Sequence, residues 1–248
     1  MVDPVCGKQV REYTAEAATF FEGRIYYFCS GEHKAEFLTH PEDYSNQVSM
    51  GKVKFGVMGA ASGDLPQDIR NRAYELGAAV ARKCMVMVTG AAPGFPWESA
   101  NGAQEHGGLS IGISPALSLD EHLDVYDSPT DVFDVMIYTG SGLMGREVVN
   151  IRSSDLIAII GGHSGTLGEF AIAYDEGKLI GVLEGSGGIA DIIPDLVTAI
   201  DKETGSTIIY DSDPHALVER MVDTYVTKHF RRPSIFVRNN RGKHTLPG

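Results

Sequence analysis

The stretch from Asp155 to Lys178, DLIAIIGGHSGTLGEFAIAYDEGK, constrains the fold most, because an apolar run ends there at glycines and a helical pattern begins a few residues later. Leu156 to Ile160 is short and apolar without alternation, which is typical of a strand buried on both faces of a parallel sheet. Gly161, Gly162 and Gly165 allow a bound group to approach the backbone closely. The pattern therefore predicts a strand, a phosphate-sized turn and a helix.

Two residues in this stretch allow two interpretations. Thr166 is predicted to cap the helix, whose free N–H groups and dipole favour an anion such as phosphate. Thr166 and Glu169 also have the spacing of a capping box, in which the glutamate only satisfies a free backbone N–H group. The spacing alone leaves both interpretations open.

From Val53 onward, strand patterns alternate with helix patterns. The predicted strands are 53–58, 85–89, 109–113, 132–138, 156–160, 179–183 and 207–210, and the predicted helices include 67–83, 99–106, 144–153, 189–201 and 214–229. Alternation of this kind indicates βαβ units and a doubly wound parallel sheet, a Rossmann-like α/β fold. Ligands of such sheets bind beyond the carboxyl ends of the strands.

Four glycine-bearing turns, at 59–63, 90–94, 139–145 and 161–165, each follow a predicted strand. They are therefore expected at one edge of the sheet, where together they indicate a site for a nucleotide or a sugar phosphate. The residues expected to hold this ligand are Gly59, Ser62, Gly63, Gly90, Gly94, Gly140, Gly142, Gly161, Gly162, His163, Ser164, Gly165 and Thr166. The only tryptophan, Trp97, follows one of these turns and either covers a ligand or anchors the core.

Residues 1 to 46 read as a separate small α+β module, because many aromatic residues gather there around two cysteines. Arg24 to Phe28 suggests a strand, and Ser30 is suited to cap a short helix. Cys6, Cys29 and His33 could then reach one metal ion, on which so small a domain often depends to fold. The alternative is that the cysteines are small buried hydrophobic residues. Zinc is the expected metal for thiolate and imidazole ligands, with copper or iron open.

The segments MVDPVCGK, YYFCS and PEDY, with His33 and Phe37, resemble the YHS domain over nearly all of residues 1–46. That domain is regarded as a metal-binding module, so the resemblance implies a metal here. Lys8 stands where the family usually has methionine.

The segment GGHSGTLGE resembles the PGGxGTxxE signature of the LOG family of phosphoribohydrolases, with Ile160 in place of the leading proline. The segment at 144–155, MGREVVNIRSSD, resembles the family's MHxRK segment, and 88–103 resembles its glycine-rich turn. The resemblance covers roughly 53 to 210 and extends to the wider Rossmann-like superfamily that includes DprA and the molybdenum cofactor carrier proteins. It implies that Arg146 and Glu169 are catalytic, whereas Glu147 replaces a lysine of the family.

LOG-like chemistry is hydrolysis of the N-glycosidic bond of a nucleoside 5′-monophosphate, such as AMP, to free base and ribose 5-phosphate. Glu169 is expected to stabilise the oxocarbenium-like transition state or activate water, in its ionised form because a helix N-terminus favours a negative charge. Arg146 is expected to hold the phosphate or orient Glu169, or else to be a solvated helix residue. The charge reversal at Glu147 keeps an alternative open, a non-catalytic carrier or sensor of a nucleotide or molybdopterin-type cofactor, with the YHS module binding or sensing metal.

Length and charge bound the remaining expectations. The 248 residues suit a small and a larger domain, with expected limits at 1–46 for the YHS-type module, 47–52 for a linker, 53–238 for the LOG-like domain and 239–248 for a tail. A formal net charge of −12 disfavours nucleic acid and anionic membranes as partners.

There is no signal-peptide core or membrane-spanning run, so a cytoplasmic protein is expected. The family resemblance implies a homo-oligomer, a dimer or a tetramer. Cys84 is expected to be a packed thiol.

Overall fold

The computed structural model describes residues 1–45 and 51–231 of the chain. The expected tail at 239–248 lies outside the described residues, and so does the expected linker except for Gly51 and Lys52. Within the described part, no helix is long and apolar enough to cross a membrane.

The larger part of the chain is built on a seven-stranded sheet in the order β6-β5-β4-β3-β7-β8-β9, in which every neighbouring pair is parallel. The predicted doubly wound α/β fold is therefore confirmed. Six of the seven strands agree with the predicted ones to within one residue at either end, and two of these six, β7 and β8, agree at both ends, whereas β6 begins three residues later than predicted. The strands are β3 Lys54–Gly59, β4 Val86–Thr89, β5 Leu109–Ser114, β6 Val135–Tyr138, β7 Leu156–Ile160, β8 Leu179–Leu183 and β9 Thr207–Asp211.

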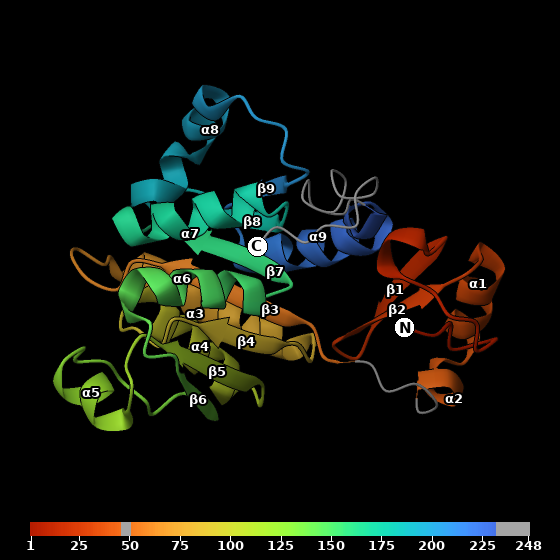
Figure 1. The fold of residues 1–248 in the computed structure, drawn as a ribbon, viewed down its shortest axis with the longest axis horizontal. Coiled ribbons are helices and arrows are strands. Elements are labelled where there is room, and N and C mark those ends of the chain that lie inside the picture. The colour runs from red at the N-terminus through yellow and green to blue at the C-terminus, as the bar shows by residue number, and fades with distance from the viewer. Residues whose placement is uncertain (46–50, 232–248) are drawn as a thin grey trace.

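Helices cover both faces of this sheet (Figure 1). On one face, α3 Gln67–Arg82, α4 Phe95–Glu105 and α9 Pro214–Thr227 share a core with alternate strand residues such as Val57 and Ala158. On the other face, α6 Gly142–Ser153, α7 Ser164–Asp175 and α8 Gly188–Ile200 pack on the intervening residues, such as Ile157 and Ile159. The central strands therefore contribute to two cores, which explains their uninterrupted apolar sequence.

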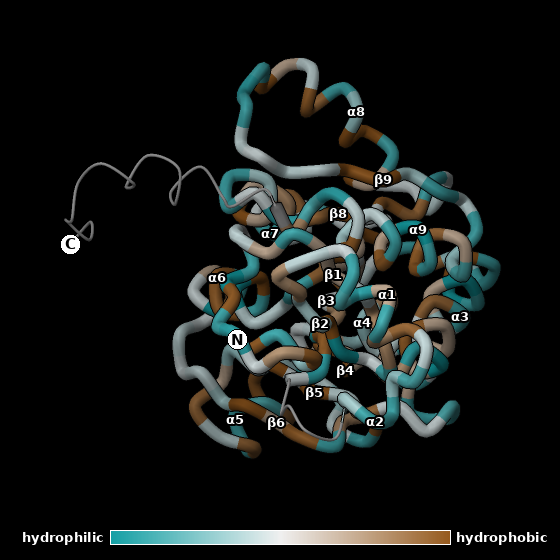
Figure 2. The backbone as a smooth tube through the Cα atoms, turned by 90° about the vertical axis from the view of Figure 1, so that its right-hand side faces the viewer, coloured by the Kyte–Doolittle hydropathy of each residue, from teal (hydrophilic) through white to brown (hydrophobic). Residues whose placement is uncertain are grey.

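The outer elements carry mixed polarity. Along α8, hydrophobic and hydrophilic residues alternate (Figure 2), and Ala190 and Ile193 form its buried face. The short helix α5 Leu119–Asp124, which the sequence patterns did not predict, lies at the opposite end of the large domain from α8 (Figures 1 and 2).

The N-terminal module is a two-stranded antiparallel hairpin followed by two short helices. The hairpin pairs β1 Ala17–Phe21 with β2 Arg24–Phe28, and the helices are α1 Gly31–Thr39 and α2 Pro41–Ser45. The predicted cap is confirmed, since the Ser30 side chain accepts a hydrogen bond from the N–H of His33. Tyr26, Phe28 and Phe37 form a small aromatic core.

The hairpin also packs against the large domain, beside α9 (Figure 1). Tyr27 belongs to the same apolar core as Val53 and places its hydroxyl 3.2 Å from that of Tyr225 on α9. At the hairpin turn, Gly23 has φ +76°, and a Cβ there would lie 2.0 Å from the carbonyl oxygen of Cys84. Only glycine allows this close approach, so the turn is fitted to the large domain.

Candidate functional site

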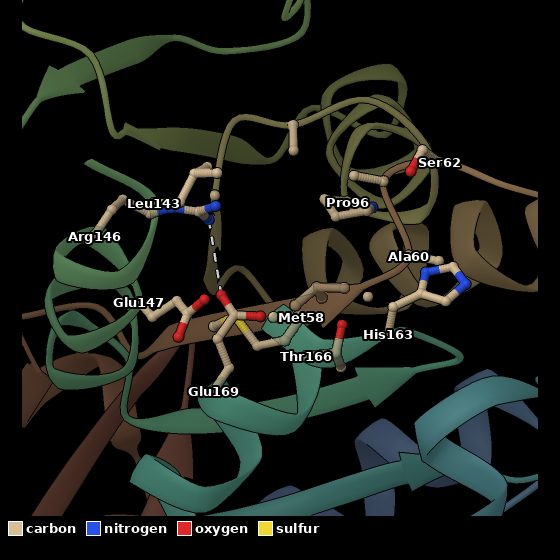
Figure 3. Close-up of a pocket in the computed structure, with 16 residues that line it drawn as sticks. Met58, Ala60, Ser62, Pro96, Leu143, Arg146, Glu147, His163, Thr166 and Glu169 are labelled. Carbon is tan, nitrogen blue, oxygen red and sulfur yellow. Dashed lines mark ion pairs between the residues drawn. The ribbon is translucent and has the colours of Figure 1, made fainter. Parts of the chain in front are cut away.

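A cavity of about 300 Å³ lies at the carboxyl ends of β3, β4 and β7 (Figure 3), the edge at which ligands of doubly wound sheets bind. Its walls come from the end of β3 and the loop after it, the turn after β4, and the facing sides of α6 and α7. The lining residues are Val57, Met58, Gly59, Ala60, Ala61, Ser62, Gly90, Ala92, Pro96, Leu143, Arg146, Glu147, His163, Gly165, Thr166 and Glu169.

The structure brings about half of the expected ligand residues into this wall, namely Gly59, Ser62, Gly90, His163, Gly165 and Thr166. Gly63 and Gly94 line a neighbouring cleft together with Ser62. Gly140, Gly142, Gly161, Gly162 and Ser164 line neither space.

The glycines that line neither space lie outside it for two different structural reasons. The turn at 139–145 follows β6, the edge strand three places from β3, so only Leu143 of its residues reaches the cavity. Gly161 and Gly162 are buried at the end of β7 and face the loop before α8. There the N–H of Gly161 donates to Ser186 Oγ, and the carbonyl of Gly162 accepts from the N–H of Ile189.

The predicted helix cap at Thr166 is wrong. Helix α7 begins at Ser164 with His163 as its N-cap residue, which makes no side-chain capping bond. The capping-box interpretation is wrong too, because Glu169 lies beyond the first turn and its carboxylate faces α6. The N–H of Leu167 already donates to the carbonyl of His163, which leaves the N–H groups of residues 164–166 for an anion.

Glu169 is buried at one end of the cavity, where its carboxylate faces Arg146 and Asn150. Arg146 Nη1 lies 3.7 Å from Glu169 Oε1, and Asn150 Nδ2 donates to the same oxygen at 3.2 Å. Arg146 and Asn150 lie one turn apart on α6, and Figure 3 shows Arg146 and Glu169 pointing toward each other. A Cβ on Gly90 would lie 1.5 Å from Arg146 Nη1, so glycine is required for this placement of the guanidinium.

Two polar atoms of this group have no hydrogen-bond partner among the described residues, Arg146 Nε and Asn150 Oδ1, although both are buried. Buried polar atoms without partners are uncommon in proteins because each costs free energy of desolvation. Their position beside the cavity indicates a region organised for a polar ligand or a proton.

Burial raises the pKa of Glu169 to about 7, and the opposing effects of Arg146 and Asn150 do not cancel it. The expectation that the helix dipole keeps this carboxylate ionised is therefore wrong: Glu169 lies beyond the first turn, where the dipole acts, and desolvation raises its pKa. A carboxyl group with a pKa near neutrality can give or take a proton during a reaction. Burial also raises the pKa of Glu147, the second carboxyl group in the wall.

In the N-terminal module, Cys6, Cys29 and His33 converge as expected, and Asp3 joins them. The Cys6 and Cys29 Sγ atoms lie 3.7 Å apart, Cys29 Sγ lies 3.4 Å from His33 Nδ1, and His33 Nδ1 lies 3.0 Å from Asp3 Oδ2. Ligand atoms around a tetrahedral zinc ion lie roughly 3.3–3.8 Å apart, given metal–ligand distances of about 2.0–2.3 Å. All four donor atoms lie within 4.8 Å of one another, so the set fits a tetrahedral ion.

The cysteines are not buried hydrophobic residues, because Cys6 is exposed and Cys29 is half-buried. The nearby Asp3 carboxylate raises the pKa of the Cys29 thiol to about 11, an effect that a bound cation would reverse. Sequence reasoning missed Asp3, although its place three residues before Cys6 puts a carboxylate on the same loop. A carboxylate completes the four donors that a closed metal site needs.

Two other predictions concern single side chains. Cys84 is exposed and lies in the left-handed region at φ +56°, so the expected packed thiol is wrong. Trp97 is half-buried and lines the neighbouring cleft, where its Nε1 donates to Asp131 Oδ1 at 3.0 Å.

Comparison with known proteins agrees with both resemblances. Residues 52–218 match the model of the SLOG cluster4 family, and residues 1–48 match that of the YHS domain. An uncharacterised protein of Archaeoglobus fulgidus is 34% identical over 135 residues, which are 54% of this chain and 82% of the relative.

Solved structures of similar fold include two proteins described by their link to the molybdenum cofactor. The molybdenum cofactor binding protein of Rippkaea orientalis has a TM-score of 0.58 and 27% identity, with 71% of this chain and 98% of that one covered. The molybdenum cofactor carrier protein of Chlamydomonas reinhardtii has a TM-score of 0.58 and 28% identity, with 71% and 100% covered. DprA of Streptococcus pneumoniae, at 15% identity and a TM-score of 0.51, shares the fold. The chain belongs to the SLOG cluster4 family and carries a YHS domain at its N-terminus.

Proposed function

We propose that the large domain binds a nucleoside 5′-monophosphate in the cavity between α6 and α7 and hydrolyses its N-glycosidic bond to free base and ribose 5-phosphate. The observation that carries this proposal is the buried Glu169, with a pKa of about 7 and Arg146 at 3.7 Å, in the wall of a cavity at the ligand-binding edge of the sheet. A cavity of about 300 Å³ is at the lower end of the range for small-ligand sites.

The start of α7 is the proposed phosphate site. Gly165 and Thr166 line the cavity there, and the N–H groups of the first turn have no partner within the helix. Such N–H groups and the positive end of the helix dipole stabilise a phosphate. Thr166 adds a hydroxyl donor on the same side.

The proposed reaction breaks the bond between the base nitrogen and C1′ of the ribose, and the oxygen of water forms the new bond to C1′. Ionised Glu169 stabilises the positive charge that develops on the ribose and accepts a proton from the attacking water. Glu169 then gives this proton to the departing base and becomes ionised again, so that one water supplies both the new hydroxyl at C1′ and the proton of the free base. Arg146 orients the Glu169 carboxylate from α6, because its guanidinium is fixed against Gly90.

The test is release of free base from AMP, GMP, CMP and UMP, followed by chromatography with the full-length protein. Release from at least one of them is expected, and Glu169→Gln should slow it by about 10²–10⁴-fold while the nucleotide still raises the melting temperature. Glu147→Gln is the matched control, since it removes the neighbouring carboxylate and leaves the Glu169–Arg146 pair. If no monophosphate yields free base, the hydrolase proposal is wrong.

The second candidate is a carrier of a molybdopterin-type cofactor or of a nucleotide. Two observations favour it: Glu147 places a second carboxylate in the wall, and two proteins of similar fold are described as binding or carrying the molybdenum cofactor. A carrier keeps its ligand, so native mass spectrometry of the freshly purified protein should show the cofactor bound and unchanged after incubation. Base release without a retained cofactor would contradict this candidate.

We further propose that Asp3, Cys6, Cys29 and His33 hold one divalent metal ion, with zinc expected from the donor set. Two thiolates, an imidazole and a carboxylate would close the coordination sphere, so the ion would stabilise the module. Elemental analysis after purification without added metal should show about one ion per chain.

We also propose that the protein forms a homo-oligomer, either a dimer or a tetramer. Large apolar side chains are exposed on the edge strand β6 and at the start of α6, namely Val135, Ile137, Leu143 and Met144. Exposed apolar groups that lie together on a surface are typical of interaction sites. Sedimentation analysis should show a mass above that of one chain, and Met144→Lys should lower it.

A further inference from the structure

A second cleft, of about 670 Å³, adjoins the cavity. Ala61 and Ser62 line both spaces, so the loop after β3 forms the wall between them. In Figure 3, Ser62 and His163 lie at one end of the cavity and Glu169 at the other, with Thr166 between them. The proposed phosphate site at the start of α7 therefore lies between the end of the cavity that holds Glu169 and the second cleft.

The second cleft has the side chains that accept a flat ring. The indole of Trp97 lines it, oriented by the hydrogen bond from Nε1 to Asp131 Oδ1, and Leu65 and Leu123 add apolar surface. Aromatic side chains held in this way stack on nucleobases, each stack contributing about 1–3 kcal/mol.

The charges of this cleft disfavour a second phosphate. Among the described residues that line it, Arg70 alone is cationic, and it donates hydrogen bonds to Glu98 at 2.8 Å and to the carbonyl of Leu65 at 3.2 Å. Asp127 and Asp131 are exposed and add carboxylate oxygens to the lining of the cleft. Carboxylates accept hydrogen bonds from ring or amino N–H groups and repel phosphate.

We propose that the second cleft binds the second base of a dinucleotide joined through its two 5′-phosphates. One nucleoside lies at Glu169, the pyrophosphate bridge lies at the start of α7, and the second base lies beside Trp97 with its amino group toward Asp127 and Asp131. This inference rests on the proposed function, because it takes the cavity as the site of the first nucleotide.

The chain offers a direct probe, since Trp97 is its only tryptophan and its fluorescence reports on this cleft alone. The probes are diadenosine 5′,5′-pyrophosphate and ADP-ribose, which differ by the second adenine only, with AMP as the one-nucleotide reference. The dinucleotide should change the emission of Trp97 and bind about tenfold more tightly than ADP-ribose, as expected for one stacked base. ADP-ribose and AMP should leave the emission nearly unchanged.

Substitution of Trp97 tests the proposed stacking of the second base without the use of fluorescence. Trp97→Leu keeps apolar volume in the cleft and should reduce the affinity for the dinucleotide, measured by calorimetry, to that of ADP-ribose. Trp97→Phe keeps an aromatic ring and should retain most of the tenfold preference. If Trp97→Leu does not fold, the emission of the unaltered protein decides the question by itself.

The outcomes separate this inference from the proposed function. Equal affinities for the dinucleotide and ADP-ribose, with unchanged emission, overturn the inference even if AMP still raises the melting temperature and releases adenine. A change in Trp97 emission with the dinucleotide, together with no stabilisation by any of AMP, GMP, CMP and UMP, supports the cleft as a base site and contradicts the assignment of the cavity to a monophosphate. If none of the three compounds binds, the inference is wrong, and base release from the four monophosphates decides the proposed function separately.

Discussion

The two sites of this protein each contain a buried carboxyl group, Asp3 in one and Glu169 in the other, and the pKa values of the two groups are shifted in opposite directions. Burial alone would raise the pKa of Asp3, but hydrogen bonds from the N–H groups of Cys29 and Val5 and from His33 lower it well below its usual range. Glu169 has one donor, Asn150, and an arginine at 3.7 Å, so burial raises its pKa to about 7. Asp3 therefore stays charged because several groups donate hydrogen bonds to it, whereas the more deeply embedded Glu169, with fewer donors, holds its proton up to a higher pH.

This difference matches two uses of a carboxyl group. Asp3 is a permanent anion tied into the loop before Cys6 and the start of α1, as a metal ligand must be. Glu169 changes charge near neutrality, as a group that exchanges protons in a reaction must. Removal of one donor, one charge or one contact therefore tests whether each carboxyl group has the use assigned to it.

The largest effect is expected from Cys29→Ser. Loss of the thiolate removes one of four donors, and binding free energies of structural zinc sites are about 10–16 kcal/mol, so metal content should fall from about one ion per chain to nearly none. Cys84→Ser is the matched control, because Cys84 is also exposed but lies outside the cluster. Equal metal content in the two variants, measured by elemental analysis, would show that the cluster does not hold the ion.

The second largest effect concerns how the free energy of unfolding changes with pH. The folded-state pKa of Glu169 is about 7, above its ordinary value of 4.5, so the folded protein holds this proton more tightly than the unfolded chain. Ionisation therefore destabilises the fold as pH rises from about 4.5 to 7, by about 3 kcal/mol across the window. The free energy of unfolding should decrease over this range in the unaltered protein relative to Glu169→Gln, as measured by urea denaturation at each pH. Parallel curves would contradict the raised pKa.

The patterns that predicted the fold correctly are local ones. The strands 156–160, 179–183 and 24–28 agree with β7, β8 and β2 because each is an apolar run bounded by turn residues. The six-residue helix α5 was missed, since it is too short to show a period. The cap at Thr166 failed because the helix begins two residues earlier.

The site was predictable only where a motif marks it. Glu169 and Arg146 come from a recognisable signature, and the structure places them in one cavity wall. Asn150 was not singled out, although it lies one turn from Arg146, because its role depends on the packing of α6 against α7. The pKa of Glu169 could not be inferred either, since the desolvation that raises it comes from tertiary packing, which the local sequence does not show.

A smaller effect should follow from removing the single donor of Glu169. The hydrogen bond from Asn150 lowers the pKa of Glu169, so Asn150→Leu should raise that pKa further, by about one unit, or about 1.4 kcal/mol. If ionised Glu169 is the active form, the rate of base release rises with pH through about 7, and the midpoint of this rise should shift upward by the same amount. A lower rate with an unchanged midpoint would show that Asn150 has only a packing role.

The smallest effect is expected where the two regions meet, and it asks whether the metal cluster alone holds the N-terminal module together. The hydroxyl of Tyr225 on α9 donates to the Glu12 carboxylate and lies 3.2 Å from the hydroxyl of Tyr27, so Tyr225→Phe should weaken the docking of the hairpin by about 1 kcal/mol. Amide hydrogen exchange in β1 and β2 should then become about fivefold faster in the metal-bound protein. Tyr174→Phe, which removes a hydroxyl that donates to the carbonyl of Lys202 within the large domain, is the matched control and should leave the hairpin amides unchanged. Unchanged exchange in both variants would mean that the metal cluster and the aromatic core stabilise the module without help from the large domain.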